Sequence, residues 1–234
     1  MHHATAKSRV PSGSRPTGGL WRGLTDEQTK TVLAAARLHK YKTHQVIFRT
    51  EEPANHLYLL WRGHVHFYRV AADGTQILLR LLAPEDVFGL GSLVQDSVRY
   101  IGTAEAMDSC HVLIWDRTSI RRFATSYPLM TANALRIVLH YIGVFAKRHS
   151  ALVTDTAEHR LAYVLTRLAC RTGRLLSDGL EINVKNEDLA SLADINRFTA
   201  SRLLKKWERK GALQKNRGTV LIRHPEKILA CDRH

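Results

Sequence analysis

The chain has 234 residues, a length that suits one large domain or two small ones. Its hydrophobic fraction of 44% and charged fraction of 24% are ordinary for a globular protein and exclude disorder along the whole chain. Thirty-five Lys and Arg against 21 Asp and Glu give a net charge of +14. Such an excess favours a polyanionic partner, namely DNA, RNA or an acidic membrane.

The N-terminal segment, residues 1–19, is rich in Ser, Pro, Gly and basic residues and has no acidic residue. We expect a disordered basic tail there. The segment lacks the apolar core of a signal peptide, and no stretch approaches about 18 consecutive apolar residues, so we expect a cytoplasmic protein without a membrane partner. The three cysteines lie about 60 residues apart, which excludes a local disulfide framework or metal-cluster motif. They are Cys110, Cys170 and Cys231.

An N-terminal β-rich region follows a predicted helix that begins after Thr25, a residue suited to capping it. Between residues 40 and 116 short runs of β-forming residues alternate with turns, and Ala72-Asp73-Gly74 is a hairpin signature. This spacing predicts an antiparallel barrel or sandwich and excludes a Rossmann fold. The runs are Val46–Phe48, Leu57–Trp61, Val65–Phe67, Ile77–Leu82 and Val112–Trp115.

A long helix is predicted around residues 127–152, where apolar residues recur at heptad-like spacing. The apolar face is broad, and a helix paired with its twin in a second subunit uses it better than packing on its own domain alone. We therefore expect a homodimer. The interface residues are Leu135, Val138, Ile142 and Phe145, with Leu139 and Ala146 beside them. A second helix should run from Ala157 to about Arg171 and end at Gly173.

Residues 186–223 have the pattern of a winged helix-turn-helix. Asn186 and Asn196 are expected to cap two helices, and Asp194 between them suits a turn that needs a positive φ. In the second helix one face is apolar and the opposite face is basic. The apolar face is Ala200, Leu203, Leu204 and Trp207, and the basic face is Arg202, Lys205, Lys206 and Arg209.

The segment from Ile195 to Arg223 contains nine basic residues and one acidic residue, Glu208. Gly211 should end the second helix, and Leu213–Ile222 reads as a hairpin that turns at Arg217-Gly218. A winged helix of this kind inserts its second helix into the major groove of DNA.

Four stretches carry a resemblance to a known family. They are Leu57–Gly63 followed by Asp73-Gly74, Pro84–Gly89, Thr156–Ala162, and Asn196–Thr199 with Arg202. At these residues the sequence resembles the Crp/Fnr transcription factors. The resemblance implies an α+β fold with an N-terminal double-stranded β-helix (jelly-roll) sensor domain, a long dimerisation helix and a C-terminal winged helix. The expected boundaries are a tail at 1–19, a sensor domain at 20–125, a dimerisation helix at 126–153 and a DNA-binding domain at 154–234.

The resemblance also assigns DNA contacts. Arg197 and Arg202 match the family arginines that read guanine edges, for which a planar guanidinium is suited. Phe198 stands where many relatives carry a glutamate that accepts a hydrogen bond from cytosine, and an aryl ring would instead touch a thymine methyl group. Asn196 and Thr199 match phosphate-contacting positions at the helix N-terminus. Lys205, Lys206 and Arg217 are further phosphate contacts.

The sensor domain departs from the relatives that bind cyclic nucleotides. Leu90 follows Gly89 where those relatives carry a glutamate for the ribose, and Tyr100 stands at the position of the phosphate-binding arginine, with Arg99 one residue earlier. Unpaired ribose hydroxyls would cost binding free energy, so we expect no binding of cyclic AMP. The effector stays unknown, and its pocket would be empty or hold an apolar molecule. The pocket residues are Gly89, Leu90, Gly91, Ser92, Arg99 and Tyr100.

Other cofactors and functions find little support. The chain lacks the cysteine cluster of an iron–sulfur sensor, and haem is left open only because we expect His64 and His66 to share one face of a strand. The sequence has no metal-site pattern and no catalytic motif, so we expect no metal and no enzyme.

The sequence therefore predicts a homodimeric transcription regulator that binds an inverted repeat in double-stranded DNA, with RNA polymerase as a further partner. An effector-independent regulator of the same family stays open. So does a ligand-binding or scaffold protein whose basic surface does not read DNA.

Overall fold

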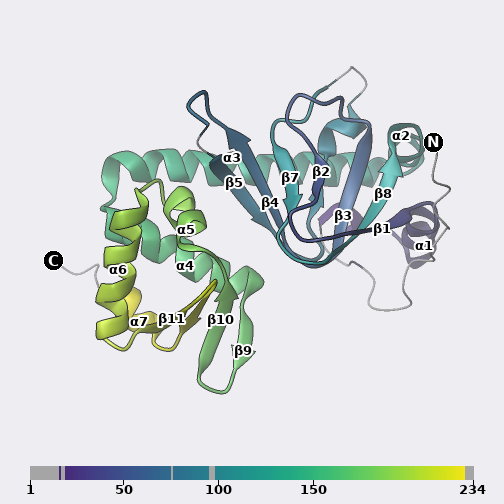
Figure 1. The fold of residues 1–234 in the computed structure, drawn as a ribbon. Coiled ribbons are helices and arrows are strands. Elements are labelled where there is room, and N and C mark those ends of the chain that lie inside the picture. The colour runs from purple at the N-terminus through teal and green to yellow at the C-terminus, as the bar shows by residue number, and fades with distance from the viewer. Residues whose placement is uncertain (1–15, 17–18, 75, 95–97, 230–234) are drawn as a thin grey trace. The chain divides into compact units, whose positions relative to one another are not determined.

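The computed structural model describes residues 16, 19–74, 76–94 and 98–229. The chain forms two compact units, one ending at Ile142 and the other beginning at Gly143, and each is described by itself (Figure 1). The predicted tail lies outside the described residues except for Pro16 and Gly19, and Cys231 also lies outside them.

Two antiparallel four-stranded sheets form a β-roll in the N-terminal unit, as the jelly-roll prediction required (Figure 1). The first sheet has the order β1 (Arg37–Tyr41), β8 (Cys110–Asp116), β3 (His56–Arg62) and β6 (Val87–Phe88). The second has the order β2 (Val46–Phe48), β7 (Thr103–Ala106), β4 (Val65–Val70) and β5 (Gln76–Leu82). The predicted turn between β4 and β5 is present, with Gly74 at a φ of 82°.

The β-roll has two apolar clusters because β3 is buried on both of its faces. Alternate residues of a strand point to opposite faces. Tyr58 and Leu60 belong to an interior cluster rich in aromatic rings, and Leu57 and Leu59 belong to a second cluster beneath the helices. The second cluster joins the sheet to the helical segments at both ends of the unit and includes Leu20, Trp21, Val32, Trp115, Ile120 and Met130.

Short helices flank the β-roll. A 3-10 segment η1 (Gly19–Trp21) precedes α1 (Asp26–Ala34), whose predicted cap is confirmed because the Thr25 side chain accepts a hydrogen bond from the Gln28 N–H. The Trp115 indole donates to the Val32 carbonyl over 2.7 Å and ties β8 to α1. A second 3-10 segment η2 (Leu90–Leu93) follows β6, and α2 (Arg117–Ser126), capped by Asp116, follows β8.

The long helix α3 (Pro128–Thr154) begins within the N-terminal unit. Its buried Asn133 donates to the Leu20 carbonyl over 3.1 Å and to the Arg22 carbonyl over 2.7 Å, and Met130 and Ala134 pack into the second cluster. Within the described residues α3 meets the length and composition of a membrane-spanning helix, with 17% of its most apolar window buried. The predicted interface residues lie on its open side, where Leu135 is 59% and Ile142 57% exposed.

The C-terminal unit is a winged helix, as predicted (Figure 1). Its helices are α4 (Ala157–Thr172), α5 (Asn186–Leu192), α6 (Arg197–Arg209) and α7 (Pro225–Leu229). Its antiparallel sheet has the order β11 (Leu213–Asn216), β12 (Thr219–Ile222), β10 (Gly179–Asn183) and β9 (Arg174–Leu176). The expected turn at Arg217-Gly218 joins β11 to β12, and Gly218 has a φ of 82°.

One predicted cap is wrong. Asn186 is the first residue of α5, and Lys185 occupies the capping position. The Asp188 carboxylate accepts a hydrogen bond from the Lys185 N–H over 3.4 Å, so the third helical residue supplies the polar group expected from Asn186.

Candidate nucleic-acid interface

The turn between α5 and α6 closes the first helix with a Schellman motif. Asp194 has a φ of 51°, as predicted, and its N–H donates to the Ser191 carbonyl over 3.3 Å. The Ile195 N–H donates to the Ala190 carbonyl over 3.0 Å. Together these bonds satisfy carbonyls at the end of α5 that would otherwise lack a partner in the helix. The motif fixes where α6 begins.

The N-terminus of α6 is open to solvent. Asn196 caps the helix as predicted, because its Oδ1 accepts a hydrogen bond from the Thr199 N–H over 2.7 Å. The first N–H groups of the helix lie at this end, where the helix dipole favours an anion. Asn196 is exposed and Thr199 half-buried, which suits their predicted phosphate contacts.

The two faces of α6 differ as the sequence predicted. Ala200, Leu203, Leu204 and Trp207 are buried in the C-terminal unit. Arg197, Phe198, Arg202, Lys205 and Arg209 are exposed. One face of the helix therefore anchors it, and the other presents cations and an aromatic ring to solvent.

Phe198 is the most unusual side chain of the exposed face. It is 72% exposed, and the Arg197 guanidinium lies 5.0 Å from the centre of its ring. An exposed phenylalanine leaves apolar surface in water, which is unfavourable unless a partner covers it. The ring is positioned beside Arg197 at the end of α6 that would enter a groove first.

The cations assigned to phosphates lie in different surroundings. Lys205 is exposed, and Arg217 is exposed in the turn of the wing. Lys206 is engaged within the protein, since its Nζ lies 2.7 Å from Oε2 of Glu158 at the start of α4. That ion pair holds α6 against α4, a role that the sequence analysis missed because the two residues are 48 positions apart.

The region of the predicted effector pocket is closely packed. Gly89 has a φ of 75°, and a Cβ there would lie 2.6 Å from the His56 carbonyl. The ring of Tyr100 stacks on Phe48 with centroids 3.9 Å apart, and its hydroxyl donates to the His56 carbonyl over 3.1 Å and accepts from the His56 N–H over 3.0 Å. Burial raises the pKa of Tyr100, so the hydroxyl stays neutral. Tyr100 thus fills the interior of the β-roll.

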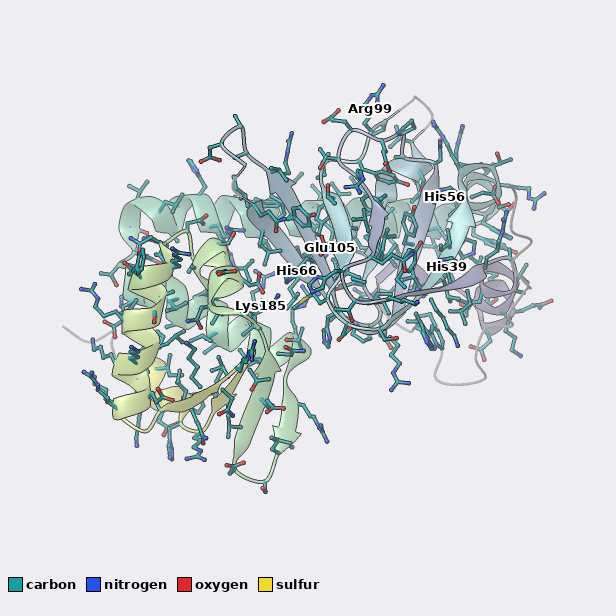
Figure 2. All side chains as sticks on the ribbon, viewed as in Figure 1. His39, His56, His66, Arg99, Glu105 and Lys185 are labelled. Atoms are coloured by element: carbon teal, nitrogen blue, oxygen red, sulfur yellow. The ribbon has the colours of Figure 1, made fainter. Side chains whose placement is uncertain are left out.

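Of the remaining residues of the predicted pocket, Arg99 lies at the surface and the others lie in η2. Arg99 is exposed at the edge of the β-roll (Figure 2), and its guanidinium donates to the Glu51 carbonyl. Leu90 is half-buried and packs on the second apolar cluster, while Gly91 and Ser92 lie in η2 beside it. Leu90 therefore has no side-chain hydrogen-bonding group at its position, and the Arg99 guanidinium is held at the surface by a backbone carbonyl.

The expected histidine pair is not on one strand. His64 precedes β4, and its Nδ1 lies 2.8 Å from Oδ2 of Asp108, whereas His66 is within β4. Asp108 therefore holds the His64 ring in the turn, and the prediction that both histidines lie within one strand is wrong. Across the described part of the chain, no group of three or more His, Cys, Asp or Glu could hold a metal ion. Burial raises the pKa of Cys110 to about 12, which keeps its thiol protonated.

A β-roll followed by a long helix and a winged helix with a basic recognition face defines a DNA-binding transcription regulator with a sensor domain. The cyclic nucleotide-binding domain family matches residues 38–127, and the Crp-like helix-turn-helix family matches residues 159–231. The chain belongs to the Crp/Fnr family of transcription regulators.

Similar proteins cover most of the chain. The cyclic AMP receptor protein of Thermus thermophilus is 27% identical over 206 residues, which are 87% of this chain and 92% of that protein. The anaerobic regulatory protein of Bacillus subtilis is 24% identical over 195 residues, 82% of each chain. The structure of FixK2 from Bradyrhizobium japonicum has a TM-score of 0.72 at 21% identity, covering 85% of this chain and 98% of that one, and shares the fold. The Crp/Fnr homologues are transcription regulators, which agrees with the prediction that the chain is not an enzyme.

Proposed function

We propose that this regulator acts in the cytoplasm as a homodimer that binds an inverted repeat, with one α6 in the major groove of each half-site. Half-sites bound in this way lie about one helical turn, or roughly 10 base pairs, apart. The observation that carries the proposal is the exposed basic and aromatic face of α6, opposite a face that is buried in its own domain.

In this proposal Arg197 and Arg202 each donate two hydrogen bonds to a guanine, and Phe198 touches a thymine methyl group. Asn196 and Thr199 contact a phosphate at the start of α6, and Lys205 and Arg217 contact phosphates farther along the groove. Lys206 reaches a phosphate only if its ion pair with Glu158 opens, so we expect it to contribute least.

The dimer is supported by the open stripe of α3. Leu135, Leu139, Ile142 and Phe145 are between 41% and 59% exposed, and Val138 is 37% exposed. Their heptad-like spacing matches a pair of helices better than it matches a scattered set of surface residues. The same apolar surface accounts for the membrane-like composition of α3 without a membrane. Ile142→Lys should give a monomer in sedimentation velocity, whereas the matched change Lys30→Ile on the exposed side of α1 should leave the dimer intact.

We further propose that the sensor domain does not bind cyclic AMP, although several relatives are named for that nucleotide. The aromatic packing around Tyr100 and the outward position of Arg99 support this view. They also favour an effector-independent regulator as the second candidate. Calorimetry with cyclic AMP, cyclic GMP and cyclic di-GMP tests both statements. Saturable binding of cyclic AMP would refute both, and saturable binding of either other nucleotide would refute effector independence alone. Contact with RNA polymerase is a further expectation for an activator.

The direct test of DNA reading is a binding assay on a duplex that the wild-type protein selects from random DNA. Arg197→Ala and Arg202→Ala should each lower affinity by about 1–3 kcal/mol and relax the preference at one guanine. Arg167→Ala, which removes a cation from α4, is the matched control. Affinity should also fall steeply with salt. Wild-type affinity in both base-reading variants, or a flat salt response, would favour the scaffold alternative.

A further inference from the structure

The turn between α5 and α6 is held by an arginine of α3. The Arg148 Nη2 lies 3.0 Å from both carboxylate oxygens of Asp194, and its Nε lies 3.3 Å from Oδ2. The same Nη2 donates to the Ser191 carbonyl over 3.1 Å. The three groups together are called the turn latch.

A second arginine extends the turn latch. Arg160 of α4 donates from Nε to the Ala193 carbonyl over 2.9 Å and from Nη1 to the Asp155 carbonyl over 2.7 Å. Asp155 lies between α3 and α4, so one guanidinium bridges the end of α3 and the turn before α6. The turn is thus tied to the α3 segment both directly and through α4.

The contacts of Arg148 are partly buried, and its partners carry negative charge or partial negative charge. Its side chain is 17% exposed and that of Asp194 32% exposed, so the ion pair is partly shielded from water and salt. The carbonyls of Ser191 and Ala193 lie at the C-terminal end of α5, where the helix dipole favours a cation. Asp194 occupies a left-handed conformation that glycine adopts with less strain, and its carboxylate gives a reason for aspartate there.

Arg148 also lies on the helix that carries the proposed dimer interface. Successive residues of an α-helix project about 100° apart, so Arg148 lies about 120° around α3 from Ile142 and about 60° from Phe145, at the edge of the apolar stripe. One side of α3 can therefore contact a second subunit while Arg148 holds the turn of its own winged helix.

We infer that Arg148 is a positioning residue, which fixes α6 relative to α3 so that a dimer presents its two α6 helices at a set spacing. The inference rests on the homodimer and inverted repeat proposed above. Once one α6 is bound, the second α6 meets the second half-site within the same complex. A rigid connection between the two helices raises the effective concentration of the second α6 at that half-site. Loss of the turn latch should weaken binding to the full repeat but not to one half-site.

The test compares full-length variants on three kinds of duplex: the selected repeat, a single half-site, and repeats with two base pairs added or removed between the half-sites. Arg148→Met removes the guanidinium, and Asp194→Gly removes the carboxylate while suiting the positive φ. Arg167→Met, which removes a cation whose guanidinium lies 3.5 Å from the Tyr163 hydroxyl, is the matched control.

We expect both latch variants to bind the repeat about tenfold more weakly, a typical coupling factor, and to bind the half-site within about twofold of wild type. They should also discriminate less between the spacer lengths, and the control should behave as wild type. Equal losses on repeat and half-site would mean that the turn latch only supports the fold, and unchanged spacer discrimination would likewise overturn the inference. If wild type itself binds repeat and half-site equally well, the homodimer proposal fails, and the inference fails with it.

Discussion

Phe198 offers a sharp test of base reading because its ring can be examined without changing any hydrogen bond. We expect the ring to contact the methyl group of a thymine in each half-site. Replacing that thymine by deoxyuridine removes the methyl group alone, and Phe198→Ala removes the ring alone. The two changes form a double-mutant cycle.

The magnitude follows from the exposed surface. A phenylalanine side chain presents about 200 Å², so an exposure of 72% leaves about 140 Å² in water. If a base covers roughly a third of that area, 25 cal/mol per Å² gives about 1.2 kcal/mol, or about eightfold in affinity. The methyl group by itself is worth about 0.8 kcal/mol, or about fourfold.

Fluorescence anisotropy with a duplex carrying one half-site measures each corner of the cycle. Wild type should bind the uracil duplex about fourfold more weakly, Phe198→Ala should bind the thymine duplex about eightfold more weakly, and Phe198→Ala should not distinguish the two duplexes. Arg202→Ala, which keeps the ring, should still distinguish them. A full uracil penalty in Phe198→Ala would show that the ring does not touch the methyl group.

Three further results are expected. Asn133→Ala should lower the free energy of unfolding by about 1–3 kcal/mol in chemical denaturation, because two backbone carbonyls near the start of the β-roll lose their donor; an unchanged midpoint would contradict this. Burial lowers the pKa of His56 below its ordinary 6.5, so the unfolded chain takes up a proton that the folded one resists, and thermal stability should fall as the pH drops below about 6.5. His56→Gln should make that fall shallower. Lys205→Ala should reduce the slope of log affinity against log salt by about 0.9, whereas Lys30→Ala should leave it unchanged.

The two faces of α6 could be predicted because both depend on helical periodicity, which is visible within one short stretch of the sequence. Leu203 and Trp207 repeat at the spacing of a buried face, and Arg202 and Lys205 repeat at the spacing of the opposite one. Asp194 could be predicted for a similar reason, since few residue types tolerate its backbone conformation.

Other elements carried weaker signals. Strand β1 is rich in basic residues and β7 consists largely of small ones, so neither reads as a run of β-forming residues. Helix α2 has ten residues, of which only Ile120, Phe123 and Ala124 are apolar, so the sequence offers few positions from which to recognise it.

Contacts between distant residues could not be predicted at all. Arg148 and Asp194 are 46 positions apart, and nothing in either neighbourhood indicates the other. The same holds for Lys206 and Glu158. Helical periodicity placed Lys206 on the basic face of α6, but it did not indicate the ion pair with Glu158.

Helix α3 is fastened by a polar side chain near each end, by Asn133 to the segment before α1 and by Arg148 to the turn before α6. Between these two residues the ring of Tyr141 also contacts the sensor domain, since the guanidinium of Arg80 in β5 lies 4.1 Å from the ring centre. A chimera of two related regulators joined within residues 142–147 would therefore keep all three contacts within their own domains. The middle of α3 is therefore the position at which the sensor domain of one regulator can be joined to the DNA-binding domain of another.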